Sequence, residues 1–250
     1  MAKRKSDSNK NNLASSSSSS SLTFTNFSQQ WRTALENTTQ RFEREYRQEK
    51  PSLPSEIETI AIFEQWKTGT LQNIIASPFW ELKTPKKKQT WLDIGCGLSF
   101  LIYPWYEWDA FFYGQEVSTT ARDIVTSRAP QLNSKLFRGV KLGSAHLLAY
   151  EDNFFDGVVA TGWSCYYPLD YWERVLTEVK RVLKPSSCFI FDVIDPESTL
   201  AEDWAILETY LGAEVFLTPL SDWEKCVRQA GGKMIKRNPG ELFQCWQIRF

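Results

Sequence analysis

The residues best suited to chemistry lie in one short segment, residues 91–97, which read WLDIGCG. Gly95 and Gly97 let the backbone approach a ligand without a clash from a β-carbon. A dinucleotide-binding loop needs a third glycine or an alanine where this chain has Phe100, and Asp93 would repel a pyrophosphate. The segment therefore predicts a loop that binds a cationic ligand, one with an amino or sulfonium group.

A second acidic residue, Glu116, follows Asp93 by 23 residues and ends an apolar stretch, residues 110–117. In nucleotide-binding sheets, an acidic residue about 20 positions after the glycine turn, at the end of the next strand, binds ribose hydroxyls. Glu116 thus predicts that the ligand carries a ribose.

These residues need a sheet that brings strand ends together. Strand and helix patterns alternate after Gln89, which is typical of a parallel sheet with helices on both faces. The expected strands are residues 90–94, 110–117, 136–142, 155–160 and 188–194, followed by a hairpin of residues 233–236 and 242–250. The expected helices are a short one after Leu98 that Pro104 breaks, one from Ser118 to about Arg128 that Pro130 stops, and residues 169–183, 197–211 and 221–230. The prediction is an α/β fold: a doubly wound, mostly parallel, seven-stranded Rossmann-like sheet with a C-terminal antiparallel hairpin.

The chain before this sheet divides into two parts. Residues 1–21 contain seven consecutive serines and cannot form a core, so we expect a disordered tail, with an organelle transit peptide as the alternative. Residues 22–88 carry helical periodicity from Phe27 to Tyr46, a second helical stretch from Ile57 to Trp66, and a third after Gly69. We predict a helical cap and linker over residues 22–88 and a catalytic domain over residues 89–250.

Composition excludes several classes of protein. The net charge of −1 disfavours nucleic-acid binding. No apolar run approaches the roughly 18 residues of a membrane span. Five cysteines without a CxxC pair favour a reducing cytoplasm, and a single histidine, His146, disfavours a metal site.

Further motifs give the segment a family. Residues 91–97 resemble the first motif of class I S-adenosylmethionine (SAM)-dependent methyltransferases, and Glu116 falls where that family binds the SAM ribose. Residues 143–158 are similar to the family's adenine loop and fourth strand, and residues 178–192 to its helix-to-fifth-strand passage. The resemblance implies SAM as cofactor, held by Asp93, Gly95, Cys96, Gly97, Glu116, Val117, Ser144, Ala145, Thr161 and Gly162.

Three positions depart from the family pattern. Ser99 replaces the third glycine of the first motif, Ser186 and Ser187 replace a glycine pair, and Ser144 replaces the aspartate that binds the adenine amino group. We expect His146 to line the pocket, with a role as general base as the alternative. Two aromatic groups follow strand ends, and we expect them in the core, with ligand contact as the alternative: Tyr103, Trp105, Tyr106, Trp163, Tyr166 and Tyr167.

The predicted function is SAM-dependent methylation of a small-molecule acceptor beneath the helical cap, with no nucleic acid, membrane or metal involved. Two alternatives stay open. One is a non-catalytic interaction protein with the SAM-binding fold, which Ser99 and Ser144 would favour; the other is a nicotinamide oxidoreductase, which Phe100 disfavours. The sequence identifies neither the acceptor, nor a catalytic residue, nor the oligomeric state.

Overall fold

The computed structural model describes residues 29–71, 78–133 and 135–250. The predicted tail, Phe27 and most of the stretch after Gly69 lie outside the described residues. No helix within these ranges is long and apolar enough to cross a membrane. The division into cap and catalytic domain at residue 88 stays a prediction.

Seven strands among the described residues form one sheet in the order β3-β2-β1-β4-β5-β7-β6. The first five in this order are parallel, and β7 is antiparallel to both β5 and β6. The expected sheet and terminal hairpin are therefore confirmed. The strands are β1 Thr90–Ile94, β2 Phe111–Glu116, β3 Phe137–Leu142, β4 Phe155–Ala160, β5 Leu183–Ile194, β6 Lys233–Asn238 and β7 Phe243–Arg249.

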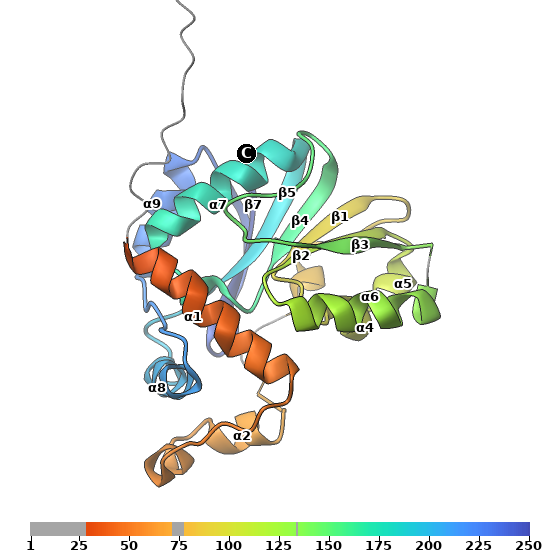
Figure 1. The fold of residues 1–250 in the computed structure, drawn as a ribbon. Helices are drawn as coiled ribbons and strands as arrows, with labels where there is room; N and C mark the ends of the chain where they lie inside the picture. Colours follow the sequence, from red (N-terminus) through yellow and green to blue (C-terminus); the bar gives the residue numbers. More distant parts are fainter. Residues whose placement is uncertain (1–28, 72–77, 134) are drawn as a thin grey trace, which may run out of the picture.

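Helices cover both faces of the sheet (Figure 1). The order reverses between β1 and β4, so the carboxyl ends of these strands flank a crevice where open α/β sheets bind ligands. The helices after β1 are α4 Ser99–Ile102, α5 Trp105–Trp108, α6 Thr119–Asn133, η3 Ser164–Tyr166, α7 Leu169–Val182, α8 Ala201–Leu211 and α9 Leu220–Gln229.

Three expected boundaries in the sheet domain were wrong by four residues or more, and one of them is the start of α8, which lies at Ala201 and not at residue 197. α6 continues past Pro130 to Asn133, because a proline removes one backbone donor and the end of a helix can lose one bond. β5 begins at Leu183, five residues early. Leu183 pairs with Phe155 before the register shifts at a bulge, and regular pairing resumes at Cys188.

The cap begins with α1 Gln29–Tyr46, as expected, followed by η1 Ser55–Thr59, α2 Phe63–Lys67 and η2 Phe79–Glu81. The expected continuous helix from Ile57 to Trp66 was wrong, because the chain breaks between η1 and α2. Ile60 has an extended backbone, and the Ala61 N–H donates to the Asp203 carboxylate in α8 instead of to a helical carbonyl. A tertiary contact therefore overrides the helical period.

The core forms two clusters that follow the alternation of side chains along the buried strands. On β5, Phe189, Phe191 and Val193 face one cluster, which includes α7 and Trp31 of α1. Cys188 and Ile190 face the other, which lies beneath η2, α4 and α5. The position of a residue within β5 therefore determines which of the two clusters its side chain faces.

Candidate functional site

A cavity of about 870 Å³ lies at the carboxyl ends of the central strands, beneath the cap. This volume is within the range of small-molecule sites. α1 contributes five of its lining residues and runs between α6 and α8, as Figure 1 shows. The cavity contains eight of the ten predicted cofactor residues: Gly95, Cys96, Gly97, Glu116, Val117, Ala145, Thr161 and Gly162.

The two glycines of the first motif are required by close contacts. Gly95 has φ +65°, and a β-carbon there would lie 2.6 Å from the Trp163 ring. Gly97 has φ +45°, and a β-carbon there would collide with the Tyr46 hydroxyl of α1. The Trp163 indole N–H donates to the Ile94 carbonyl at 2.7 Å, which fixes the ring against the loop. Side chains from two other elements therefore pack directly on this backbone.

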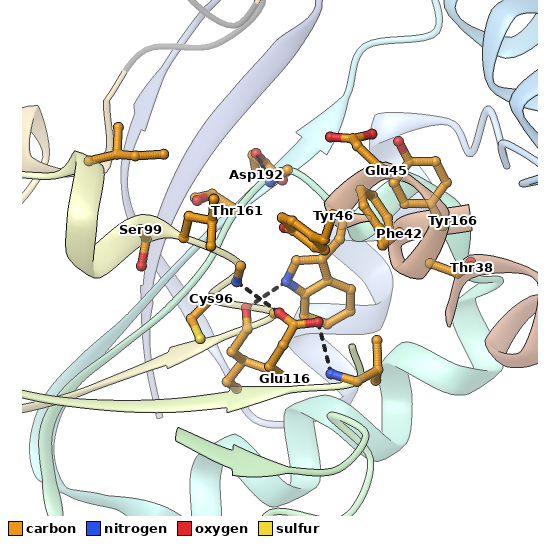
Figure 2. Close-up of a pocket in the computed structure, with 18 of the residues that line it drawn as sticks. Thr38, Phe42, Glu45, Tyr46, Cys96, Ser99, Glu116, Thr161, Tyr166 and Asp192 are labelled. Carbon is orange, nitrogen blue, oxygen red and sulfur yellow. Dashed lines mark hydrogen bonds between the residues drawn. The ribbon is translucent and has the colours of Figure 1, made fainter. Parts of the chain in front are cut away.

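Glu116 is the polar centre of the site (Figure 2). One carboxylate oxygen accepts from the Gly97 N–H at 2.8 Å, and the other accepts from the Val117 and Ser118 N–H groups, both at 2.9 Å. Only 4% of the residue is exposed. Burial raises its pKa and outweighs these three hydrogen bonds, which lower it. A carboxylate can accept about four hydrogen bonds, so roughly one acceptor position is left for a ligand.

Asp93 lies beneath the loop and is not part of the cavity lining. Its carboxylate accepts a hydrogen bond from the Ser99 hydroxyl. The pKa of Asp93 is raised to about 7. Burial raises it most, the hydrogen bond from Ser99 lowers it, and the Glu116 carboxylate raises it. Ser99, which the sequence marked only as a departure from the family pattern, is thus the partner of this carboxylate. Asp93 would therefore act on a ligand without direct contact, either electrostatically or by fixing the conformation of the glycine loop.

We expect Asp93→Asn to flatten the pH dependence of stability. A carboxylate whose pKa is about 7 when folded and about 4 when unfolded keeps its proton preferentially in the native state. The native state therefore loses stability as the pH rises from about 4 to 7, by up to about 1.4 kcal/mol per pKa unit. The measurement is the free energy of unfolding in urea at about pH 5 and pH 8. An equal fall in the variant and the wild type would contradict the assignment.

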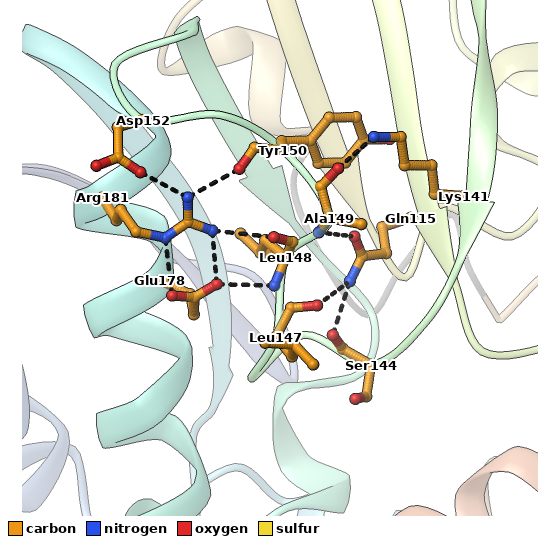
Figure 3. A network of polar contacts seen from close by, with 10 residues as sticks. All are labelled: Gln115, Lys141, Ser144, Leu147, Leu148, Ala149, Tyr150, Asp152, Glu178 and Arg181. Carbon is orange, nitrogen blue, oxygen red and sulfur yellow. Dashed lines mark hydrogen bonds and ion pairs between the residues drawn. The ribbon is translucent and has the colours of Figure 1, made fainter. Parts of the chain in front are cut away.

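The loop between β3 and β4 is fixed through its backbone (Figure 3). The Gln115 amide donates to the Ser144 and Leu147 carbonyls at 2.7 and 3.0 Å. Arg181 donates to the Leu148 carbonyl, and Glu178 accepts from the Leu148 N–H. The structure places Gly143 and Ala145 in the cavity lining but not Ser144. A role for Ser144 in binding adenine stays a prediction.

His146 does not line the cavity, because its ring packs between the edges of Trp31 and Tyr171. Burial lowers its pKa, and Glu178 raises it. The expectation that His146 lines the pocket was wrong. The six aromatic residues that follow strand ends have three different environments. Trp105 is buried in the core, Tyr106 is exposed, and the cavity is lined by Tyr103, Trp163, Tyr166 and Tyr167.

α1 is held over the cavity by two attachments. Arg41 forms a bidentate ion pair with Glu208 of α8, with N–O distances of 3.0 and 3.2 Å. Glu43 accepts hydrogen bonds from Thr119 and Thr120 at the start of α6. Sequence reasoning predicted a cap but not these contacts. The sequence signal for the first contact was Glu208, an acidic residue on the apolar face of a predicted helix, which calls for a basic partner.

The lining also includes Asp192, which sequence reasoning did not single out. Burial raises its pKa to about 7, although hydrogen bonding lowers it. In the part of the chain that the structure describes, no group of three or more His, Cys, Asp or Glu side chains is arranged to hold a metal ion.

Residues 92–191 match the model of a family described as methyltransferase domain. No curated protein matches the chain. Among solved structures, a SAM-dependent methyltransferase from Aquifex aeolicus is 15% identical with a TM-score of 0.53, over 82% of this chain and 97% of that one. A geranyl diphosphate methyltransferase in complex with its substrate and sinefungin is 11% identical with a TM-score of 0.56, over 68% and 74%.

The [4+2]-cyclase SpnF is 19% identical with a TM-score of 0.52, and the match covers 64% of this chain. The chain spans only 56% of the length of SpnF. At these identities the likeness concerns the fold. The match of residues 92–191 to the methyltransferase-domain model agrees with it, and the strand order gives this chain the Rossmann-like fold of these methyltransferases.

Proposed function

We propose that the protein transfers a methyl group from SAM to a small-molecule acceptor. The observation that carries the proposal is the Glu116 carboxylate, which is fixed by the glycine loop and retains an acceptor position at the cavity. A carboxylate in this place suits a ribose hydroxyl. Gly95 and Gly97, whose positive φ shapes the loop, also line the cavity, although the Trp163 ring and the Tyr46 hydroxyl pack on them. The residues present therefore fit SAM.

The proposed cofactor site consists of Gly95, Cys96, Gly97, Glu116, Val117, Ala145, Thr161 and Gly162, with Asp93 beneath the loop. Bound SAM supplies a methyl group on a sulfonium. The chain supplies mainly position, because alignment of the acceptor behind that methyl group makes the reaction effectively unimolecular, worth up to about 7–11 kcal/mol.

A small acceptor is supported by the shape of the site. α1, α8 and the described residues between 66 and 80 line the cavity on the side away from the sheet, and this cover favours a small acceptor over a large polymer. The geranyl diphosphate methyltransferase shows that a protein of similar fold can hold a small-molecule substrate.

The test is binding followed by turnover. Calorimetry should show micromolar or tighter binding of SAM and of S-adenosylhomocysteine (SAH). The protein with SAM labelled in its methyl group should transfer label into the small-molecule fraction of a cell extract, and sinefungin should stop the transfer. Failure to bind either ligand would contradict the proposal.

Binding without transfer would favour the alternative, a non-catalytic protein that keeps the SAM-binding fold. SpnF is described as a cyclase and has a similar fold. The fold by itself therefore does not determine the reaction, and the transfer assay decides between the two functions.

A further inference from the structure

Asp192 lies near the carboxyl end of β5 and lines the cavity. The alternation along β5 places it on the same face as Cys188 and Ile190, beneath η2 and α4. Its neighbour across the sheet is the end of β4, since Phe191 pairs with Ala160. Figure 2 shows Asp192 next to Thr161 at the cavity. Its side chain therefore leaves an apolar face of the sheet and reaches the polar corner of the cavity, which we define by Asp192, Thr161 and Gly162.

The two carboxylate oxygens of Asp192 are unequally satisfied. One accepts from the Gly162 N–H at 2.7 Å. The other is buried and makes no hydrogen bond to any residue that the structure describes. The Ser164 hydroxyl is close enough to lower the pKa of Asp192 through a side-chain hydrogen bond, although neither it nor this carboxylate oxygen has a partner with good hydrogen-bond geometry. A buried acceptor without a full set of partners destabilises the site, so this oxygen can still accept from a donor group of a ligand.

An apolar arm of the cavity leads to this corner. We call it the aromatic arm, and it consists of the lining residues Pro78, Phe79, Trp80, Ile102, Tyr103 and Pro104. The Tyr103 ring lies 5.0 Å from that of Trp80 and 6.0 Å from that of Phe79. Its hydroxyl lies against Thr161. None of these six side chains is charged, so the arm suits an apolar body whose polar end reaches Asp192.

The charge of the cavity selects the sign of that polar end. Its described lining holds four carboxylates, from Glu45, Glu116, Asp192 and Glu208, against the guanidinium groups of Arg41 and Arg128. Arg41 is already paired with Glu208 and Glu45. A sulfonium cofactor with a zwitterionic amino acid group adds one net positive charge. A negative excess remains, and aromatic faces also attract cations. An ammonium group fits this corner better than a phosphate or a carboxylate.

We propose that Asp192 is a catalytic residue that binds the ammonium group of an apolar amine acceptor held in the aromatic arm and removes its proton before methyl transfer. This inference rests on the proposed function. The ammonium N–H proton moves to the free carboxylate oxygen of Asp192, which leaves a lone pair on nitrogen. That lone pair forms the bond to the methyl carbon as the carbon–sulfur bond breaks and its electrons go to sulfur. The products are an N-methylated ammonium and a neutral thioether, and Asp192 returns its proton to solvent.

The raised pKa of Asp192, about 7, is consistent with this role. A carboxylate with a pKa near the working pH is a better proton acceptor than an ordinary aspartate and is still largely ionised above about pH 7. The pKa has a consequence for binding: an ammonium ligand should lose affinity as the pH falls below 7.

The test uses the SAH complex, which cannot turn over, and 2-phenylethylamine as the probe. Its uncharged counterpart, 2-phenylethanol, has the same shape. By calorimetry at about pH 8, the wild type should bind the amine about tenfold tighter than the alcohol or better. At about pH 6 the preference should fall about tenfold, because Asp192 is then mostly protonated.

Asp192→Asn should abolish the preference for the amine and leave SAH affinity unchanged, since the asparagine oxygen can still accept from Gly162. Asp195→Asn is the matched control, because Asp195 bonds to Gln244 outside the cavity lining; it should behave as the wild type. A wild-type complex that binds SAH but does not prefer the amine, or a preference that survives in Asp192→Asn, overturns the inference. Loss of SAH binding by the wild type would instead overturn the proposed function.

Discussion

Replacing Glu116 with alanine is expected to weaken SAH binding about 10- to 150-fold. The structure leaves about one acceptor position on this carboxylate, and a hydrogen bond to a charged group contributes about 1.5–3 kcal/mol. A carboxylate that bound both ribose hydroxyls would give a larger effect. The backbone contacts of Glu116 in this structure therefore limit the expected loss to one bond.

The same substitution is expected to destabilise the fold. It leaves the N–H groups of Gly97, Val117 and Ser118 without their acceptor, and each buried unsatisfied donor costs about 1–3 kcal/mol. Binding must therefore be measured by calorimetry below the onset of unfolding, with the free energy of unfolding measured in parallel.

Asp156→Ala is the matched control for Glu116→Ala. Asp156 also accepts a backbone N–H, that of Thr90 at 2.8 Å, but at the opposite end of the sheet from the cavity. It should lower stability and leave SAH affinity unchanged. If both variants bound SAH as tightly as the wild type, Glu116 would not contact the cofactor.

The sequence predicts the sheet domain well because its signals are local. β1 and β4 have the predicted bounds, since each is an apolar run ended by a glycine or a polar residue. Glu116 could be placed because it ends a strand at a known distance from the glycine loop. The same logic applies to Asp192, an acidic residue near the end of the apolar run 188–194, and would have found it.

The cap could not be predicted in the same way, because its contacts join distant parts of the chain. Arg41 and Glu208 are 167 residues apart. Periodicity predicts that α1 has an apolar face, but it does not identify the element which that face covers. The break between η1 and α2 also depends on a distant residue, Asp203. Sequence patterns describe elements, and the part of the site that comes from the cap depends on how elements meet.

The ion pair that holds α1 to α8 is also expected to have a large effect on stability. Arg41 and Glu208 are 6% and 1% exposed. Burial lowers the pKa of Arg41, but the carboxylates of Glu208 and Glu45 outweigh this effect and raise it. Glu208→Leu should therefore cost up to about 3–5 kcal/mol of unfolding free energy, because the buried charge of Arg41 then keeps only Glu45, which is 45% exposed, as its partner.

The double variant Arg41→Met with Glu208→Leu separates the charge from the packing. Replacing a buried ion pair by apolar side chains of similar volume is often neutral, so the double variant should be more stable than either single variant. The measurement is a double-mutant cycle in urea, with the exposed pair Arg228–Glu224 as control, for which the coupling should stay below about 1 kcal/mol. Additive losses in the buried pair would contradict the argument. If the double variant keeps its stability and still binds SAH, then apolar packing between α1 and α8 is enough to hold the cap, and the ion pair is not required. The carboxylates that would then matter for ligand binding are those of the cavity lining outside this pair, Glu116 and Asp192.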